Sequence, residues 1–281
     1  MKRKSGGWRR DLPAAAAALL LCQCNLLGTA GSLLITEEDE MQLGAAFDRH
    51  LRDSARAENP VFVANTPVRQ AYRDYVVNLA NEILNAIPAG EKPGYAANPG
   101  FTITLIDRNV QNAFAVPGGY VYIYTGIIDS MRDESELAGV LGHEIAHVTR
   151  HHYRDALAQQ AGLSLLLQAL IGDDAGKILQ LVAAGFASLA ALAITRENEE
   201  EADVYGTRYE GAVRRNPMGI ANFFARMQSQ GLSILSTHPL PGDRVGDVTA
   251  QVNGDPALSA LNVDSLKFQA RFQYYTGPVG P

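Results

Sequence analysis

Two histidines four residues apart, His143 and His147, enclose a glutamate at position 144. On a helix of about 3.6 residues per turn, this spacing places both imidazoles on one face, one turn apart, where they can chelate a metal ion. Glu144 is offset by about 100 degrees, so it can reach a water on the metal without binding the metal itself. The flanking residues predict a buried helix, and they are Leu137, Val140, Leu141 and Val148.

Two imidazoles leave a catalytic zinc site incomplete, because such sites usually take three protein ligands and a water. A histidine six residues beyond His147 is excluded, since Tyr153 occupies that position and Arg150 replaces the glycine of the extended pattern. His151 and His152 follow one turn later. Three successive turns of a straight helix cannot converge on one ion, so we expect these two histidines on the surface or behind the ligands.

The other source of a third ligand is the acidic run ENEEEAD at residues 197–203. Within it, Glu199 and Asp203 share a helix face at i and i+4. Alone, such a run is typical of a solvated helix surface. Beside the histidine pair it offers a carboxylate ligand, and two imidazoles with a carboxylate favour zinc among the divalent ions.

Composition limits the class of protein. The chain has 281 residues, of which 47% are hydrophobic and 19% charged, so it can bury a large core and is not a disordered linker. Its 24 basic and 30 acidic residues give a net charge of -6, and we therefore expect no nucleic-acid partner.

The first thirty residues differ from the rest. Basic residues at positions 2, 3, 4, 9 and 10 precede an apolar run from Pro13 to Cys22, and small residues follow at 28–30. We predict that residues 1–30 are a removable export signal and that residues 31–281 form a single exported domain. Both cysteines, Cys22 and Cys24, lie in this segment, so the alternative is a lipoprotein signal with a lipid anchor.

Periodicity predicts an α+β fold, mostly helical, with a small antiparallel sheet beside the histidine helix. A turn at 117–119 separates the two predicted strands, which are 101–106 and 120–124. The predicted helices are 37–52, 67–87, 134–158, 196–211, 220–230 and a short one after Asp243.

Four sequence blocks carry a resemblance to a known family: NAFAVPGG at 112–119, GHEIAH at 142–147, TRENEEEAD at 195–203 and THPLP at 237–241. In these blocks the chain resembles the gluzincin zinc metallopeptidases. They include the HtpX-like membrane proteases, the CAAX prenyl proteases and a periplasmic branch typified by BepA. The resemblance extends from about residue 37 to residue 250.

The resemblance implies one zinc per chain, held by His143, His147 and Glu199, with Glu144 as general base. It implies that Asp203 orients a ligand histidine, which fits a carboxylate accepting the free imidazole N–H. In the periplasmic branch the histidine at position 238 can take the fourth zinc position and hold the enzyme shut. The alternative for His238 is a turn histidine without a role.

Substrate contacts are expected at two places. In gluzincins the sheet edge at Asn112, Ala113 and Phe114 pairs with an extended peptide, although ordinary turn and core positions would explain these residues equally well. Arg244 is a candidate contact for a substrate carboxylate or oxyanion, and a surface arginine is the alternative.

The implied function is an exported zinc endopeptidase that hydrolyses unfolded or misassembled envelope proteins. One alternative is a zinc-containing, chaperone-like binding protein with a silent site. Another is a membrane-embedded prenyl-type protease, for which the uncharged stretch 178–194 is barely long enough. Because His143 and Glu199 must meet, the chain between them would need a second crossing, and the apolar stretch 161–171 is too short. We expect a core helix or a cover over the site, with peripheral membrane association still open.

Overall fold

The computed structural model describes residues 35–54, 61–97, 100–154, 156, 194–229, 238, 243–261 and 263–277. The predicted export signal, both cysteines, the apolar stretch 161–171 and all of 178–194 except Ile194 lie outside the described residues. Within the described ranges, no helix combines the length and the apolar character that crossing a bilayer requires.

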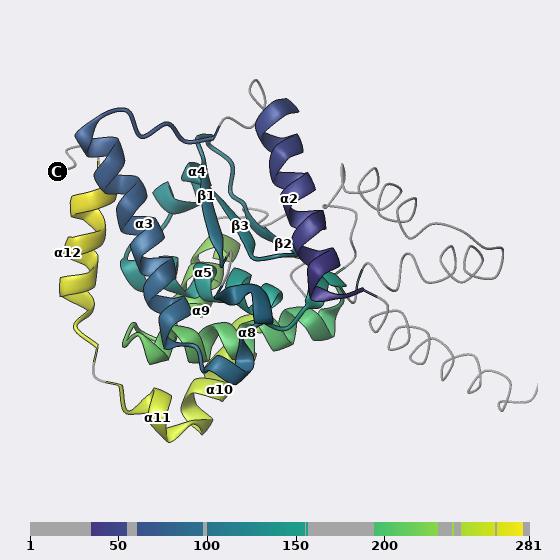
Figure 1. The fold of residues 1–281 in the computed structure, drawn as a ribbon. Helices are drawn as coiled ribbons and strands as arrows, with labels where there is room; N and C mark the ends of the chain where they lie inside the picture. The colour runs from purple at the N-terminus through teal and green to yellow at the C-terminus, as the bar shows by residue number, and fades with distance from the viewer. Residues whose placement is uncertain are drawn as a thin grey trace, which may run out of the picture.

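The fold is α+β, as expected, with helices predominating (Figure 1). The strands are β1 (Thr102–Ile106), β2 (Ala113–Val116) and β3 (Tyr120–Tyr124). The helices before the acidic run are α2 (Glu37–Ser54), α3 (Pro67–Ala86), α4 (Thr125–Asp129) and α5 (Glu134–Thr149), with short 3-10 turns at Ala89–Glu91 and Gly94–Ala96. The later helices are α8 (Arg196–Ala212), α9 (Gly219–Ser229), α10 (Arg244–Gly254), α11 (Pro256–Ser259) and α12 (Ser265–Thr276).

Helix α5, which carries the histidine pair, lies at the centre of the molecule (Figure 1). It packs against α8, α9, α3, α12 and β2, and all of its 16 residues are buried. Asp133 begins the helix by accepting hydrogen bonds from the N–H groups of Ser135 and Glu136. The prediction of a buried histidine helix is therefore confirmed.

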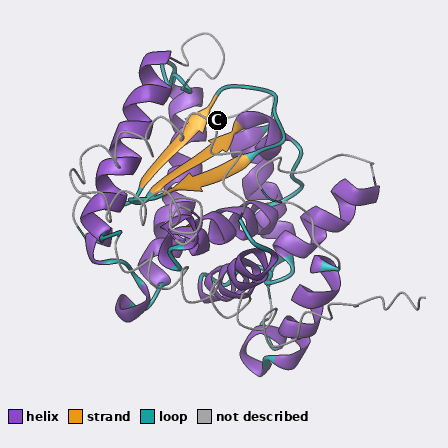
Figure 2. Ribbon diagram, turned by 90° about the vertical axis from the view of Figure 1, so that its right-hand side faces the viewer, coloured by secondary structure: helices purple, strands orange, loops and turns teal. Residues whose placement is uncertain are grey.

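The sheet is mixed, in the order β1-β3-β2, with its three strands side by side (Figure 2). Helix α2 lies on one side of the sheet and α3 on the other (Figure 1). Strands β2 and β3 are antiparallel, with Ala113 opposite Ile123, whereas β1 and β3 are parallel, with Thr102 opposite Tyr120. The predicted antiparallel pairing of 101–106 with 120–124 is wrong. Residues 113–116 form a strand that the sequence analysis missed, and the turn at 117–119 joins that strand to β3, which leaves the other side of β3 for β1.

The histidine helix is shorter than predicted. It ends at Thr149, and His151 has a φ of 57°, in the left-handed region that an α-helix cannot continue through. The chain therefore turns sharply after Arg150. This turn returns His152 to the vicinity of His147, which a straight helix to residue 158 would not do.

Candidate metal centre

Four side chains from three places in the chain converge in the core: His143 and His147 from α5, Glu199 from α8, and His238. The two Nε2 atoms of the helix histidines are 3.0 Å apart. Glu199 Oε2 lies 3.4 Å from His143 Nε2, and Glu199 Oε1 lies 3.6 Å from His147 Nε2. The Nδ1 atom of His238 is 3.4 Å from His143 Nε2 and 2.7 Å from Glu199 Oε1.

Four of these five distances fit a tetrahedral zinc ion, and the fifth, 2.7 Å between His238 Nδ1 and Glu199 Oε1, is that of a hydrogen bond. Zinc bonds to nitrogen and oxygen of about 2.0–2.1 Å place neighbouring ligand atoms about 3.3 Å apart. The ligand atoms of the four side chains all lie within 4.8 Å of one another, and all four residues are buried. Three imidazoles and one carboxylate are also ligand types that zinc accepts.

The crossing of α5 and α8 brings the ligands together. A Cβ atom on Gly142 would lie 2.9 Å from the carbonyl oxygen of Gly206, and one on Gly206 would lie 2.8 Å from the backbone nitrogen of His143. Side chains at these positions would separate the helices. The two glycines therefore allow the backbone of α8 to approach α5 closely enough for Glu199 to reach the histidine pair.

Asp203 lies behind His143 on α8. His143 Nδ1 is 2.9 Å from Asp203 Oδ1, so an N–H at Nδ1 leaves Nε2 free for a metal. Burial disfavours the charged imidazole, but hydrogen bonds to Asp203 and Glu199 outweigh it and raise the pKa of His143 to about 9. The structure thus places Asp203 where the resemblance implies a residue that orients a ligand.

Arg244, the first residue of α10, is part of the same network. Its Nε donates to Asp203 Oδ2 at 2.7 Å, its Nη2 donates to Asp203 Oδ1 at 2.5 Å, and its Nη1 lies 3.2 Å from Glu199 Oε2. Burial would raise the pKa of Asp203, but the hydrogen bonds from Arg244 and His143 lower it overall. The alternative of a surface arginine is wrong, because Arg244 is only 1% exposed.

His147 has His152 behind it, which is one of the two positions that the sequence analysis expected for His152. Its Nδ1 lies 2.9 Å from His152 Nδ1, and His152 Nε2 lies 3.2 Å from Glu201 Oε2. Burial lowers the pKa of His152 to about 4, although Glu201 opposes the shift. A neutral His152 can accept from His147 and donate to Glu201, which leaves His147 Nε2 for the metal. His151 instead contacts Glu40, 2.9 Å away.

Glu144 is fully buried beside the cluster, and burial raises the pKa of its carboxyl group. Its Oε1 lies 3.3 Å from His238 Nε2, on the opposite side of the His238 ring from Glu199. His238 therefore lies between the expected general base and the expected third ligand.

Of the candidate substrate residues, Arg244 lies in the network around the cluster, whereas the three at the start of β2 are not among the four clustered side chains. Asn112 precedes β2, and Ala113 and Phe114 begin it, all three buried. The Phe114 ring stacks on Tyr122 at 4.9 Å between centroids and meets the edge of Phe47 at 5.9 Å. The ring thus contributes to core packing, and β2 is an edge strand within the three-stranded sheet.

Comparison with known proteins places the chain in a family. The profile of peptidase family M48 matches residues 78–252, which is more than half of the chain. The beta-barrel assembly-enhancing protease of Escherichia coli strain K12 is 27% identical over 242 residues, covering 81% of this chain and 46% of that protein. A Vibrio cholerae protein provisionally given the same name is 33% identical over 251 residues, covering 83% of this chain and 48% of that protein.

A third relative is similar in length to this chain. Metalloprotease LoiP of Escherichia coli strain K12 is 25% identical over 258 residues, covering 88% of this chain and 98% of that protein. The chain thus spans about half the length of the beta-barrel assembly-enhancing relatives and nearly all of LoiP. The chain therefore belongs to peptidase family M48, the expected class of zinc metallopeptidase.

Proposed function

We propose that this protein is an exported zinc endopeptidase in which His143, His147 and Glu199 hold one zinc ion. The observation that carries the proposal is the convergence of these three side chains around one point, with Glu144 beside them. Asp203 holds the His143 ring at its Nδ1 atom, and His152 holds the His147 ring at its Nδ1 atom. Imidazoles held in this way bind a metal without first having to reorient.

Zinc, when bound, supplies the Lewis acidity that activates water and polarises a peptide carbonyl group. Glu144 is the general base in this proposal: its carboxylate accepts a proton from the attacking water and returns the proton to the leaving amine. Asp203 keeps the proton on Nδ1 of His143. Arg244 holds Asp203 in place through two hydrogen bonds and balances the negative charge of the carboxylates around it.

We further propose that the described conformation is a closed one, with His238 as a fourth ligand. The support is its position: His238 contacts Glu199 on one side and Glu144 on the other, and it is 0% exposed. A peptide carbonyl must approach both the metal and Glu144, and the ring of His238 lies in that space. Movement of His238 would open the site to substrate.

The substrate class follows from the relatives' names and is a proposal for this chain. A beta-barrel assembly-enhancing protease, by its name, acts in the assembly of barrel proteins. We infer that this chain likewise acts on unfolded or misassembled envelope proteins, in the periplasm. Residues 1–30 would then serve as the export signal or, at Cys22 or Cys24, as the site of a lipid anchor, and residues 31–281 would form the metallopeptidase domain.

Peptide binding along β2, at Asn112 to Phe114, remains part of the proposal. The support is that β2 is an edge strand of the described sheet and packs on α5, the helix of the histidine pair. Extended peptides bind enzymes of many kinds by adding a strand to such an edge.

The test of the proposed function is Glu144→Gln, assayed by cleavage of casein and by zinc content. We expect the variant to keep its zinc, because no ligand changes, and to lose at least about a thousandfold of its turnover, because general-base catalysis is removed. Glu200→Gln is the matched control: it makes the same change on α8 at a half-exposed side chain, whose only ion pair among the described residues is with Arg196.

The same variant distinguishes the proposed peptidase from the competing function, which is a zinc-containing binding protein with chaperone-like activity. Complete burial of the metal cluster is the observation that favours this alternative. A binding protein would suppress aggregation of an unfolded client equally well with Glu144→Gln and would show no cleavage with either form. Cleavage by the unaltered chain that disappears in the variant would exclude a purely binding role.

A further inference from the structure

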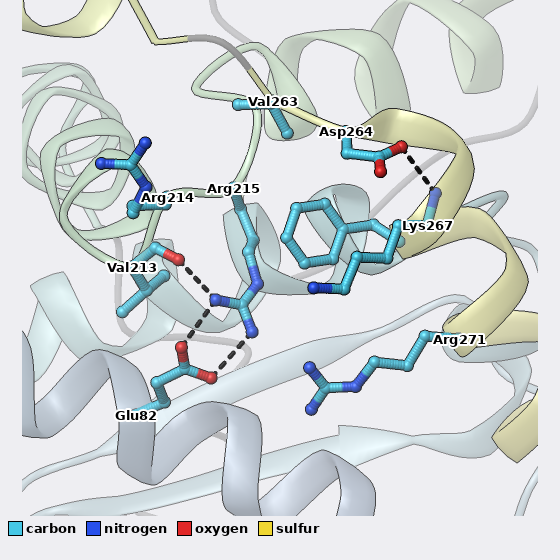
Figure 3. A pocket seen from close by; sticks show the side chains of 9 residues that line it. Glu82, Val213, Arg214, Arg215, Val263, Asp264, Lys267 and Arg271 are labelled. Carbon is cyan, nitrogen blue, oxygen red and sulfur yellow. Dashed lines mark hydrogen bonds and ion pairs between the residues drawn. The ribbon is translucent and has the colours of Figure 1, made fainter.

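A second site of charged residues lies away from the metal cluster, between α3, the end of α8 and the start of α12 (Figure 3). It is a cavity of about 390 Å³ that shares no residue with the metal cluster. Glu134, at the first turn of α5, lies beside it, and His143 follows nine residues later, about 14 Å along the helix axis. The lining residues are Glu82, Val213, Arg214, Arg215, Val263, Asp264, Lys267, Phe268 and Arg271.

The charge of this cavity is opposite to that of the chain. Four cationic and two acidic side chains line it, in a protein whose net charge is -6. Both lining carboxylates already have partners. Glu82 accepts two hydrogen bonds from Arg215, and Asp264 accepts from the backbone N–H of Lys267 as the N-cap of α12.

Arg215 forms the fixed part of the cavity wall. Its side chain is 5% exposed, and Glu82 and the buried Glu134 hold it, with Nε donating to Glu134 Oε1 at 2.8 Å. The second oxygen of Glu134 accepts from Tyr75 at 2.8 Å and lies 3.1 Å from Arg271 Nε. The acidic groups around the cavity are therefore already engaged by Arg215, by Arg271 and by the start of α12.

Lys267 and Arg271 lie one turn apart on α12, and Figure 3 shows both side chains extending toward Arg215. The ammonium group of Lys267 has no acidic partner among the residues that the structure describes. Arg271 uses its Nε for Glu134, which leaves its two Nη groups for another acceptor. Two carboxylates, Glu82 and Glu134, thus balance the three cations Arg215, Lys267 and Arg271, since Asp264 caps α12. One positive charge is left over at the cavity, which an anion would neutralise.

The cavity also has an apolar side. The Phe268 ring lies under the guanidinium of Arg215, 4.8 Å from its centroid, and Val213 and Val263 line the same space. An inorganic ion would leave these groups unused. A ligand that carries both an oxyanion and an apolar group would use both parts of the wall.

We propose that this cavity binds an organic oxyanion, a carboxylate or phosphate attached to a small apolar group, with Lys267 and Arg271 as its cationic contacts. Arginine and lysine together suit such groups, since guanidinium offers paired N–H donors and ammonium a compact charge. The two sources of this chemistry are the free carboxyl end of a peptide with an apolar last residue and a small aromatic or aliphatic phosphate.

The test is calorimetric titration of the full chain with four probes: N-acetyl-Ala-Ala-Phe as the free acid, the same peptide as the C-terminal amide, phenyl phosphate and inorganic phosphate. Whichever probe binds the unaltered chain should bind the Lys267→Gln variant at least about tenfold more weakly, which is a difference of about 1.4 kcal/mol. The melting temperature should stay unchanged, because the exposed Lys267 side chain makes no hydrogen bond or ion pair within the described part of the chain. Arg208→Gln, an exposed cation on α8, is the charge-matched control and should bind normally.

The outcomes separate the two sources. Binding of the free acid but not the amide identifies a peptide terminus, and binding of phenyl phosphate identifies a small organic phosphate. The proposal is overturned if no probe binds, if the amide binds as tightly as the acid, if inorganic phosphate binds as tightly as phenyl phosphate, or if Lys267→Gln and Arg208→Gln bind equally.

Discussion

Asp203 shows how a residue that binds no metal can decide metal affinity. Its two oxygens accept from Arg244, and Oδ1 also faces Nδ1 of His143. The carboxylate therefore selects the tautomer of His143 in which Nε2 carries the lone pair that a metal needs. Arg244 Nη2 also lies 3.4 Å from Nδ1 of His143, so without the Asp203 carboxylate that nitrogen would face only a cationic donor.

We expect Asp203→Asn to weaken zinc binding about 10–100-fold, the usual effect of losing such a partner. The measurement is competition for zinc against a chelator of known affinity. Asp247→Asn, which makes the same change at an exposed position of α10, serves as the control and should bind zinc normally. Equal zinc affinity of the two variants would show that Asp203 does not orient the ligand.

At the scale of elements, the site depends on the close approach of α5 and α8. Gly142 and Gly206 face each other at the crossing, and each glycine lies against the backbone of the other helix. Alanine is normally the better helix former by about 0.8–1.0 kcal/mol, so glycine here lowers the local stability of each helix. The close approach that the missing side chains permit is what offsets that cost.

Gly206→Ala should therefore destabilise the protein by about 1–3 kcal/mol, as overpacking does, and should weaken zinc binding because Glu199 moves with α8. Thermal unfolding with and without a chelator measures both effects. Gly254→Ala on α10 is the control, since a Cβ there meets nothing within 4 Å. If Gly206→Ala were as stable as that control and bound zinc normally, the close crossing would not be what builds the site.

The helices and strands also show where local sequence signals are enough to predict an element and its bounds. Helix α3 was predicted at 67–87 from the spacing of its apolar residues, and it spans Pro67–Ala86, where a first-position proline and the preceding Thr66 cap fix its start. The histidine helix was predicted too long, because no local signal revealed the left-handed conformation of His151. Strand β2 was missed, since four consecutive buried residues, Ala113–Val116, lack the alternation that marks a half-buried strand.

The residues of the candidate site likewise differ in how far the sequence alone could predict them. His143, Glu144 and His147 are set by one helical turn, and the sequence predicted their neighbourhood directly. Glu199 and Asp203 needed the family resemblance. Arg244 and His152 are different, because they meet their partners through tertiary packing. Helix spacing left His152 either on the surface or behind the ligands, and it revealed neither the contact of His152 with His147 nor that of Arg244 with Asp203.

At the scale of the whole molecule, the core contains an acidic group outside the metal cluster. Glu210 on α8 is 0% exposed, and no cation pairs with it within the described ranges. Burial raises the pKa of its carboxyl group well above the ordinary value, Asp133 and Glu136 add to the rise, and the backbone N–H groups of Gly219 and Ile220 oppose it. The folded protein therefore holds the proton on Glu210 to a higher pH than the unfolded chain does.

Folding takes up that proton, so the stability that Glu210 contributes is greatest below its ordinary pKa of about 4.3 and decreases as pH rises toward the raised pKa of the folded state. We expect Glu210→Gln to unfold at higher temperature than the unaltered chain at pH 7 and to show a flatter dependence on pH. Thermal unfolding between pH 5 and pH 8 measures this, with the exposed Glu38→Gln as control. A variant less stable than the control at pH 7 would mean that Glu210 is ionised and stabilising.

The central claim is that one zinc ion, held by His143, His147 and Glu199, catalyses peptide hydrolysis and that His238 closes the site. The most direct measurement is zinc content together with casein cleavage for the full chain and for His238→Ala. The account predicts one zinc per chain in both proteins, because three ligands remain, and cleavage about tenfold faster in the variant, equivalent to about 1.4 kcal/mol. Loss of zinc from the variant, or cleavage no faster than in the unaltered chain, would contradict it.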